Sequence, residues 1–163
     1  MQKAYSIGSG TIIIQPETTF IGSGARIGMD CKIHPFTYIG KNVYIGTDCI
    51  IQAYTFIPEG PKIYDRVFIG PRVTFTNDKN PPSHGRWLEE KQIIVNSSSI
   101  ICADVTILPG VFIGANAFIA AGSLVTKDVP AGGFAVGRPA QIFESRDDWT
   151  TNSGIKKLME LRF

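Results

Sequence analysis

An aliphatic residue recurs at every sixth position along most of this 163-residue chain. The ten positions from Ile21 to Phe75 in steps of six hold nine Ile and one Phe, and the six from Val95 to Val125 hold four Ile and two Val. Ile7 precedes Ile13 by the same spacing. Helices repeat every 3.6 residues and ordinary strands every 2.0, so neither produces this period. The chain is therefore built from repeated short units.

A second set of residues keeps the same register. Four residues after most of the aliphatic positions stands a small or β-branched residue, as at Ala25, Cys31 and Thr37. A unit of six residues then forms a short strand and a corner, and three units close a triangular coil. The repeat predicts about six coils, roughly 29 Å tall at the ~4.8 Å spacing of parallel strands. No unit buries its apolar face alone, so stacking must do it.

The register also assigns individual side chains. Residues 18 apart lie above one another, so Ile33, Ile51 and Ile69 should form one inward column. Cys31 and Cys49 should stack in the same way. Because the three cysteines of the chain form no CxxC pair, we interpret them as free thiols in a reducing compartment. The glycines that follow many of the aliphatic residues are expected to supply positive φ at the corners.

Two breaks interrupt the repeat. Between Phe75 and Val95 the chain has 14 residues more than one unit, and the sequence there is rich in Pro, Asn and charge. We predict a β-helix over residues 1–130 with an excursion loop at 76–93, where function would concentrate. Residues 131–163 form a C-terminal extension, and Ser153 is expected to cap a short helix that covers the open end of the coil.

Composition limits the class of protein. Hydrophobic residues make up 44% of the chain and charged residues 18%, which is typical of a globular domain. The net charge of +2 is spread evenly, without the basic stripe that nucleic acid requires. No apolar run approaches the roughly 18 residues of a membrane span, and the N-terminus carries no apolar segment. We therefore expect a cytoplasmic protein that binds neither nucleic acid nor membrane.

These motifs resemble the hexapeptide-repeat acyltransferases. The coil ending at 121–130 and the Gly137-Arg138-Pro139-Ala140 that follows it look like that superfamily, and residues 70–81, which contain Phe75-Thr76-Asn77, are similar to N-acetyltransferases of nucleotide-linked 3-amino sugars. The resemblance implies an all-β, left-handed parallel β-helix. It also implies a homotrimer with acetyl-CoA between subunits, which acetylates the amine of a dTDP- or UDP-linked sugar without a metal.

Candidate catalytic residues follow from the chemistry. An amino sugar is largely protonated near neutral pH, so a histidine could remove a proton, and the chain has only His34 and His84. His84 lies in the loop and is the candidate base, although a surface or substrate-binding role is also open. The amide oxygen of Asn77 could accept a hydrogen bond from the amine and orient it. Turn formation is the alternative reading of Asn77.

Further residues are assigned to binding. Asp78, Arg86 and His34 are candidates for substrate binding, and His34 should stack on Gln52 and Gly70 at the corner that the loop approaches. From the resemblance, we expect backbone groups around Ala103, Ala121 and Gly122 to hold acetyl-CoA. Lys127 and Arg138 could meet its phosphates, unless they are ordinary solvated charges.

Three other functions are compatible with such a scaffold. An O-acetyltransferase of a sugar or small hydroxyl acceptor is the main alternative, and an essential His84 would favour it. A β-helix carbonic anhydrase requires three His ligands, whereas this chain has two histidines. An ice-binding or purely structural prism would need a flat outer ladder of Thr, but Thr37 and Thr55 are predicted to point inward.

Overall fold

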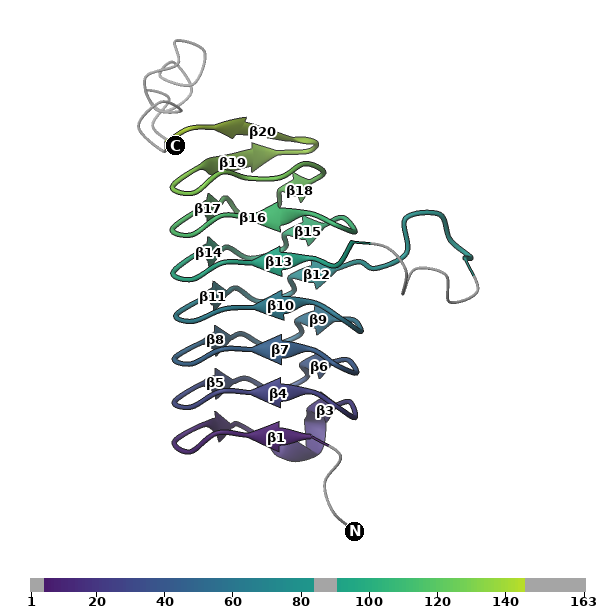
Figure 1. The fold of residues 1–163 in the computed structure, drawn as a ribbon, viewed down its shortest axis with the longest axis vertical. Coiled ribbons are helices and arrows are strands. Elements are labelled where there is room, and N and C mark those ends of the chain that lie inside the picture. Colours follow the sequence, from purple (N-terminus) through teal and green to yellow (C-terminus); the bar gives the residue numbers. More distant parts are fainter. Residues whose placement is uncertain (1–4, 84–90, 146–163) are drawn as a thin grey trace, which may run out of the picture.

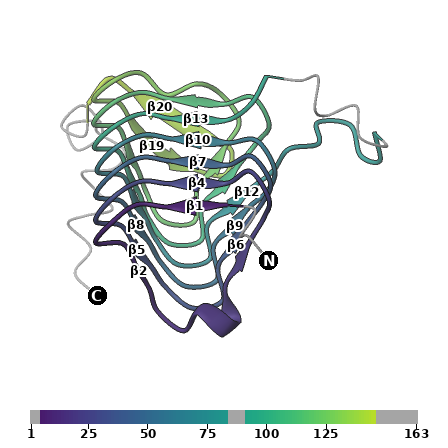
Figure 2. The ribbon, with the colours of Figure 1, turned by 60° about the horizontal axis from the view of Figure 1, so that its bottom comes forward.

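The chain winds into a left-handed parallel β-helix, and the computed structural model describes residues 5–83 and 91–145. Coils stack along one axis from the N-terminal to the C-terminal end (Figure 1), and each coil is triangular (Figure 2). The three sides of the triangle are three sheets, here named sheets A, B and C in the order in which the chain meets them. The predicted fold class is confirmed.

Each strand between β1 and β18 is two residues long, with one residue facing inward and the other outward. Sheet A holds β1 (Ser6–Ile7), β4 (Arg26–Ile27), β7 (Tyr44–Ile45), β10 (Lys62–Ile63), β13 (Ile94–Val95) and β16 (Phe112–Ile113). Sheet B holds β2 (Ile12–Ile13), β5 (Lys32–Ile33), β8 (Ile50–Ile51), β11 (Phe68–Ile69), β14 (Ile100–Ile101), β17 (Phe118–Ile119), β19 (Phe134–Gly137) and β20 (Ala140–Phe143). Sheet C holds β3 (Phe20–Ile21), β6 (Tyr38–Ile39), β9 (Phe56–Ile57), β12 (Thr74–Phe75), β15 (Thr106–Ile107) and β18 (Leu124–Val125).

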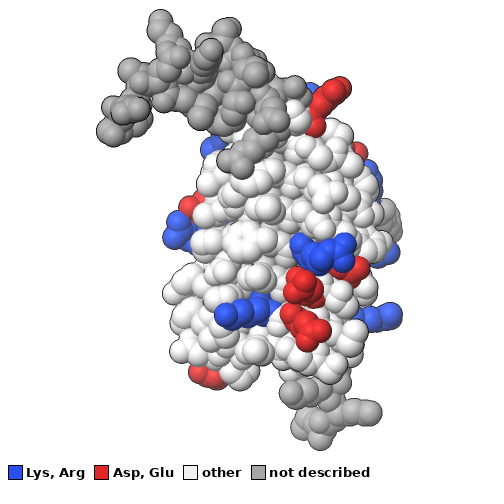
Figure 3. All heavy atoms as spheres, turned by 90° about the vertical axis from the view of Figure 1, so that its left-hand side faces the viewer, with Lys and Arg blue, Asp and Glu red and all other residues white. Residues whose placement is uncertain are grey.

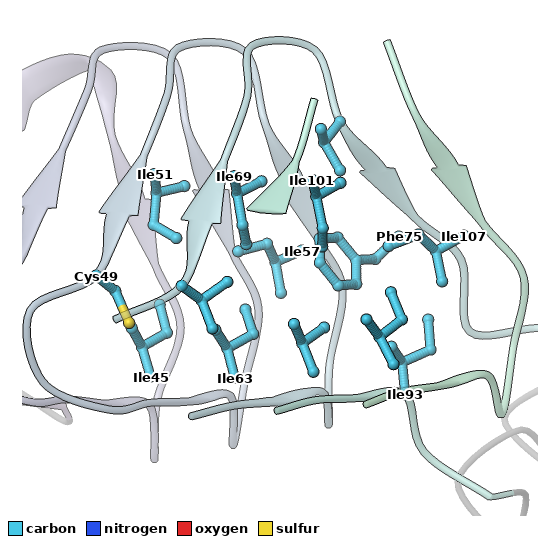
Figure 4. Packing of buried hydrophobic residues seen from close by; sticks show 14 of the residues in the cluster. Ile45, Cys49, Ile51, Ile57, Ile63, Ile69, Phe75, Ile93, Ile101 and Ile107 are labelled. Atoms are coloured by element: carbon cyan, nitrogen blue, oxygen red, sulfur yellow. The ribbon is translucent and has the colours of Figure 1, made fainter. Parts of the chain in front are cut away.

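The interior is made of the predicted columns. Ile33 pairs with Ile51 and Ile51 with Ile69, and all three side chains are buried. Figure 4 shows how Ile51, Ile69 and Ile101 succeed one another in neighbouring coils. Parallel strands buried on one side gain most of their stability from this continuous apolar contact. The period of six therefore specifies the hydrophobic core.

Small polar residues complete the interior. The buried Thr55 hydroxyl donates a hydrogen bond to the carbonyl oxygen of Gln52 at 2.8 Å. Cys31 and Cys49 are buried, free and stacked, with the amide of Cys49 3.4 Å from the Cys31 sulfur. Each thiol donates to a backbone carbonyl, that of Gly46 and of Tyr64 respectively. The predicted stacking of the two thiols is confirmed.

The glycines after the aliphatic positions have a different role from the one we predicted. Residues in the left-handed region lie two positions further on, and they include Asn42 and Arg72 as well as Gly24. Gly40 and Gly70 have no positive φ; instead, the next coil passes close above them. A Cβ at Gly40 would lie 2.5 Å from the carbonyl carbon of Pro58. Close approach of stacked corners explains these glycines.

The two ends of the coil depart from the repeat. Ile7 pairs with Ile27, 20 residues on, because a 3-10 turn at Pro16–Thr18 adds two residues to the first coil. At the other end Val129 bridges to Ile113 in sheet A, and β19 pairs with β17 in sheet B. Six coils are thus complete and a seventh is partial. The helix expected from Ser153 lies outside the described residues.

Candidate functional site

The excursion loop leaves the coil at one corner of the triangle. It runs from the end of β12 in sheet C to the start of β13 in sheet A, so we name this edge corner CA. Thr76 still belongs to the coil, because its hydroxyl donates to the carbonyl oxygen of Ile107 at 2.8 Å. Ile93, which we had assigned to the loop, is already buried in the core. The excursion proper is therefore shorter than predicted at its C-terminal end.

Asn77 stands in a column of polar residues at corner CA. Lys41, Glu59 and Asn77 follow one another at intervals of 18 residues, and each comes at the same position after a strand of sheet C. All three line a hollow of about 240 Å³. A cation, a carboxylate and an amide thus meet at the loop root.

Aromatic rings form the other wall of this hollow. Phe20, Tyr38 and Phe56 occupy successive outward positions of sheet C and line the hollow with Asn77. The Phe20 and Tyr38 rings are stacked with centroids 4.6 Å apart, and those of Tyr38 and Phe56 are 5.0 Å apart. We name these three residues the aromatic ladder. All three side chains are exposed, so the ladder offers an apolar surface to a ligand.

Asp78 organises the start of the loop. One carboxylate oxygen accepts a hydrogen bond from the amide of Asn80 at 3.0 Å, and the other accepts one from the amide of Ser83 at 2.9 Å. Asp78 also lines a second hollow on the C-terminal side of the loop root, of about 280 Å³, which includes Thr126. Two backbone bonds to the carboxylate fix the direction in which the chain leaves Asn77.

Four of the five predicted cofactor residues lie together, at a different corner. Ala103, Ala121 and Gly122 sit between strands of sheets B and C, an edge that we name corner BC. The amide of Gly122 donates to the carbonyl oxygen of Ala103 at 2.8 Å, and the Arg138 guanidinium donates to the carbonyl oxygen of Gly122 at 3.2 Å. Lys127 follows β18 and lies at corner CA instead.

His34 also lies at corner BC. It joins β5 of sheet B to β6 of sheet C, so our expectation that it shares the corner approached by the loop was wrong. The stack on Gln52 and Gly70 is as predicted, because each follows a paired strand of sheet B. Burial, and then the nearby Lys32 charge, hold the pKa of His34 below its usual value, which disfavours the protonated imidazole. His84 and Arg86 lie outside the described residues.

Sequence reasoning missed the aromatic ladder, Lys41 and Glu59. Their signal was present, because the ladder residues are also 18 apart and precede the inward isoleucines. The repeat was used to assign only the inward positions, whereas one outward column is aromatic over three coils. Within residues 5–83 and 91–145, no group of three or more His, Cys, Asp or Glu side chains is arranged to hold a metal ion. The same residues contain no helix with the length and hydropathy of a membrane span.

Comparison with known sequences identifies the repeat. The pattern of the Bacterial transferase hexapeptide (six repeats) family matches residues 24–59. A galactoside O-acetyltransferase of Lactococcus lactis is 36% identical over 88 residues, which are 52% of this chain and 42% of that protein. A 2,3,4,5-tetrahydropyridine-2,6-dicarboxylate N-acetyltransferase of Staphylococcus aureus is 33% identical over 82 residues, 50% of this chain and 32% of that protein. The matched segment thus spans less than half of either relative.

Comparison with solved structures identifies the fold. AntD, an N-acyltransferase from Bacillus cereus solved with dTDP and 3-hydroxybutyryl-CoA, superimposes with a TM-score of 0.76 at 23% identity, covering 95% of this chain and 91% of that one. At this identity the similarity concerns the fold. Together with the repeat match, it confirms the predicted fold: the chain is a left-handed β-helix protein, and its residues 24–59 carry the hexapeptide repeat of bacterial transferases.

Proposed function

We propose that this protein is an acetyl-CoA-dependent N-acetyltransferase that acetylates the amine of a nucleotide-linked amino sugar. The observation that carries the proposal is the hollow at corner CA, where Asn77 closes a column of Lys41 and Glu59 beside the aromatic ladder. A nucleotide-linked amino sugar has an amine, a diphosphate and flat rings. The hollow offers an amide oxygen, a cation and an apolar wall to these groups.

Asn77 acts by orientation in this proposal. Its amide oxygen accepts a hydrogen bond from the acceptor amine, which aims the nitrogen lone pair at the thioester carbonyl. The ammonium first gives one proton to solvent or to a base, and the neutral amine then attacks. A C–N bond forms and the C–S bond breaks, while the second proton leaves nitrogen and ends on the departing thiolate. Asp78, through its bonds to the amides of Asn80 and Ser83, keeps the loop from displacing Asn77. His84 stays a prediction for the base.

The acyl donor is proposed to bind at corner BC. Backbone groups of Ala103, Ala121 and Gly122 would hold its pantetheine arm, and Arg138 would meet its phosphates. Acetyl-CoA supplies the activated acyl group. These residues and Asn77 lie on different corners of the β-helix and in different coils, so within residues 5–83 and 91–145 the hollow that contains Asn77 includes none of them. A homotrimer would bring corner BC of one copy to the loop of the next, and Lys127 at corner CA could then add a second cation.

The relatives support the reaction class from two sides. AntD is named as an N-acyltransferase and its structure holds dTDP. The Lactococcus lactis relative is named as a galactoside O-acetyltransferase, which makes a hydroxyl acceptor the second candidate. The 3-position of the amine and the cytoplasmic location stay predictions.

Thiol release from acetyl-CoA tests the proposal. Purified protein should release thiol when dTDP- or UDP-linked 3-amino or 4-amino sugars are added, and should not do so with galactosides or serine. Asn77→Ala should lower kcat by about 10²-fold, because orientation is lost while the hollow remains. Asn80→Ala, a change at a nearby loop residue that does not line this hollow, is the matched control and should retain activity.

Two outcomes would contradict the proposal. Activity restricted to galactosides would identify an O-acetyltransferase. Full activity of the Asn77→Ala enzyme with amino-sugar nucleotides would remove Asn77 from the site and leave the hollow without its assigned role.

A further inference from the structure

The outward surface of sheet A carries a further hollow, which we name the sheet A hollow. It has a volume of about 410 Å³ and is lined by Gly24, Arg26, Asn42, Val43, Tyr44, Lys62 and Tyr64. None of these residues lines the hollow that contains Asn77. The two hollows lie on opposite sides of corner CA, and a hydrogen bond of 3.1 Å from the Asn42 amide to the Glu59 carboxylate runs between their linings. The volume lies within the range of small-molecule sites.

Two cationic side chains, Arg26 and Lys62, flank the sheet A hollow. Arg26, Tyr44 and Lys62 are in register on adjacent strands β4, β7 and β10, so the two cationic residues are separated by two strand spacings, about 10 Å. Among the described residues that line the hollow there is no carboxylate. In the described part of the chain, neither Arg26 nor Lys62 takes part in an ion pair or a side-chain hydrogen bond. Their donors are therefore available to an anion.

Tyr44, on the strand between the two cations, and Tyr64, which follows β10, add aromatic surface to the hollow. The ring of Tyr44 meets that of Tyr64 edge to face, with centroids 5.9 Å apart and planes inclined by 62°. Both rings are partly exposed. Gly24, in the left-handed region, contributes no side chain at the rim. The hollow thus combines aromatic surface for a flat ring with two flanking charges for an anion.

We infer that this hollow is a binding site for a nucleoside diphosphate, separate from the site that contains Asn77. Arg26 and Lys62 bind the phosphates through charge-assisted hydrogen bonds, and the base or ribose packs on Tyr44 and Tyr64. An anion without a ring would leave the aromatic surface unused, and a nucleoside without phosphate would leave both cations unpaired. The inference stands on the geometry of sheet A and does not require the proposed reaction.

Fluorine NMR of the full-length protein labelled with fluorotyrosine tests the inference. The chain has five tyrosines, so single Tyr→Phe variants assign every resonance. UDP, dTDP and ADP are titrated separately, which distinguishes nucleotide-sugar bases from the adenine of coenzyme A, with uridine and inorganic pyrophosphate as partial ligands. Tyr44 and Tyr64 should shift together and saturate with a nucleoside diphosphate. Tyr54, which lines neither hollow, should not move.

Charge variants give the matched comparison. Arg26→Gln with Lys62→Gln should weaken the affinity reported by Tyr44 at least about tenfold, because both phosphate contacts are lost. Lys32→Gln, on the outward face of sheet B, should leave it unchanged. Unmoved Tyr44 and Tyr64 resonances at millimolar nucleoside diphosphate would overturn the inference. If inorganic pyrophosphate bound as tightly as a nucleoside diphosphate, the packing of the base or ribose on Tyr44 and Tyr64 would be ruled out.

Tyr38 reports separately on the hollow that contains Asn77, because it belongs to the aromatic ladder. Shifts of Tyr44 and Tyr64 without thiol release would support the sheet A site and contradict the proposed reaction. Thiol release together with shifts at Tyr38 alone would support the proposed reaction and contradict the sheet A site.

Discussion

The interior and the outward face of sheet B contain the same kind of residue in opposite surroundings. Ile51 has no exposed surface, whereas its neighbour Ile50 on the same strand is 37% exposed. Ile101 and Ile100 repeat this contrast with 0% and 40%. The inward isoleucines have all their contacts within the chain. The outward ones lack such cover in the described structure, although their side chains are equally apolar.

The three outward faces are also unlike one another. Sheet B presents the outward column Ile12, Lys32, Ile50, Phe68, Ile100 and Phe118. The corresponding column of sheet A begins with Ser6, Arg26, Tyr44 and Lys62. Figure 3, which looks at the left-hand side of Figure 1, shows uncharged surface beside a mixed group of basic and acidic side chains. Exposed apolar patches of this kind mark contact surfaces, so sheet B is the face that we assign to the proposed trimer.

The largest effect should come from truncating the interior. Ile51→Ala should lower the free energy of unfolding by about 2–5 kcal/mol, because a rigid column of side chains cannot collapse into the cavity. Ile50→Ala removes the same atoms from the outward side and should cost far less. Chemical denaturation followed by circular dichroism measures both. Equal losses of unfolding free energy in the two variants would mean that the inward and outward sides of β8 contribute equally to stability.

The second effect concerns assembly. Replacing both Ile50 and Ile100 with Lys places two charges on the proposed contact face of sheet B, where burying them without partners is unfavourable. The proposed trimer should dissociate to monomers in size-exclusion chromatography with light scattering. Acetyl transfer should fall with it, because the proposed site is shared between two copies. Ser6→Lys on sheet A is the control and should stay trimeric. A trimer that survives the double change would place the interface elsewhere.

A smaller effect separates inward from outward threonines. Thr55→Val keeps the shape but removes the hydroxyl that donates to the Gln52 carbonyl, so stability should fall by about 1 kcal/mol. Thr74→Val, at an outward position of sheet C, should change stability by less than about 0.5 kcal/mol. Thermal unfolding of the two variants against the wild type measures the difference. A larger loss for Thr74→Val would reverse the comparison.

The same contrast explains what the sequence could predict. Inward positions such as Ile33 and Thr37 repeat because every coil encloses the same narrow space, and this makes them readable from spacing alone. The outward positions do not share one enclosed space, so their residue types differ from coil to coil. The spacing of six therefore did not reveal the aromatic ladder at Tyr38. Asn77 was singled out through resemblance and lines a hollow, while its role in the reaction stays a prediction. His34 was assigned to the wrong corner because the spacing gives the stack but not the edge from which the loop leaves.

The smallest effect is expected at His34, at the edge between interior and surface. Burial, followed by the Lys32 charge, lowers its pKa, so the folded state disfavours the protonated form. The resulting stabilisation is complete above the unfolded pKa of about 6.5 and is lost as the pH falls towards the folded pKa. In a His84→Asn variant His34 is the only histidine, and its imidazole resonances should titrate with a midpoint below 6.5. Lys32→Gln should raise that midpoint slightly, since burial is the larger cause. A midpoint at or above the usual value would contradict burial as the dominant influence on His34.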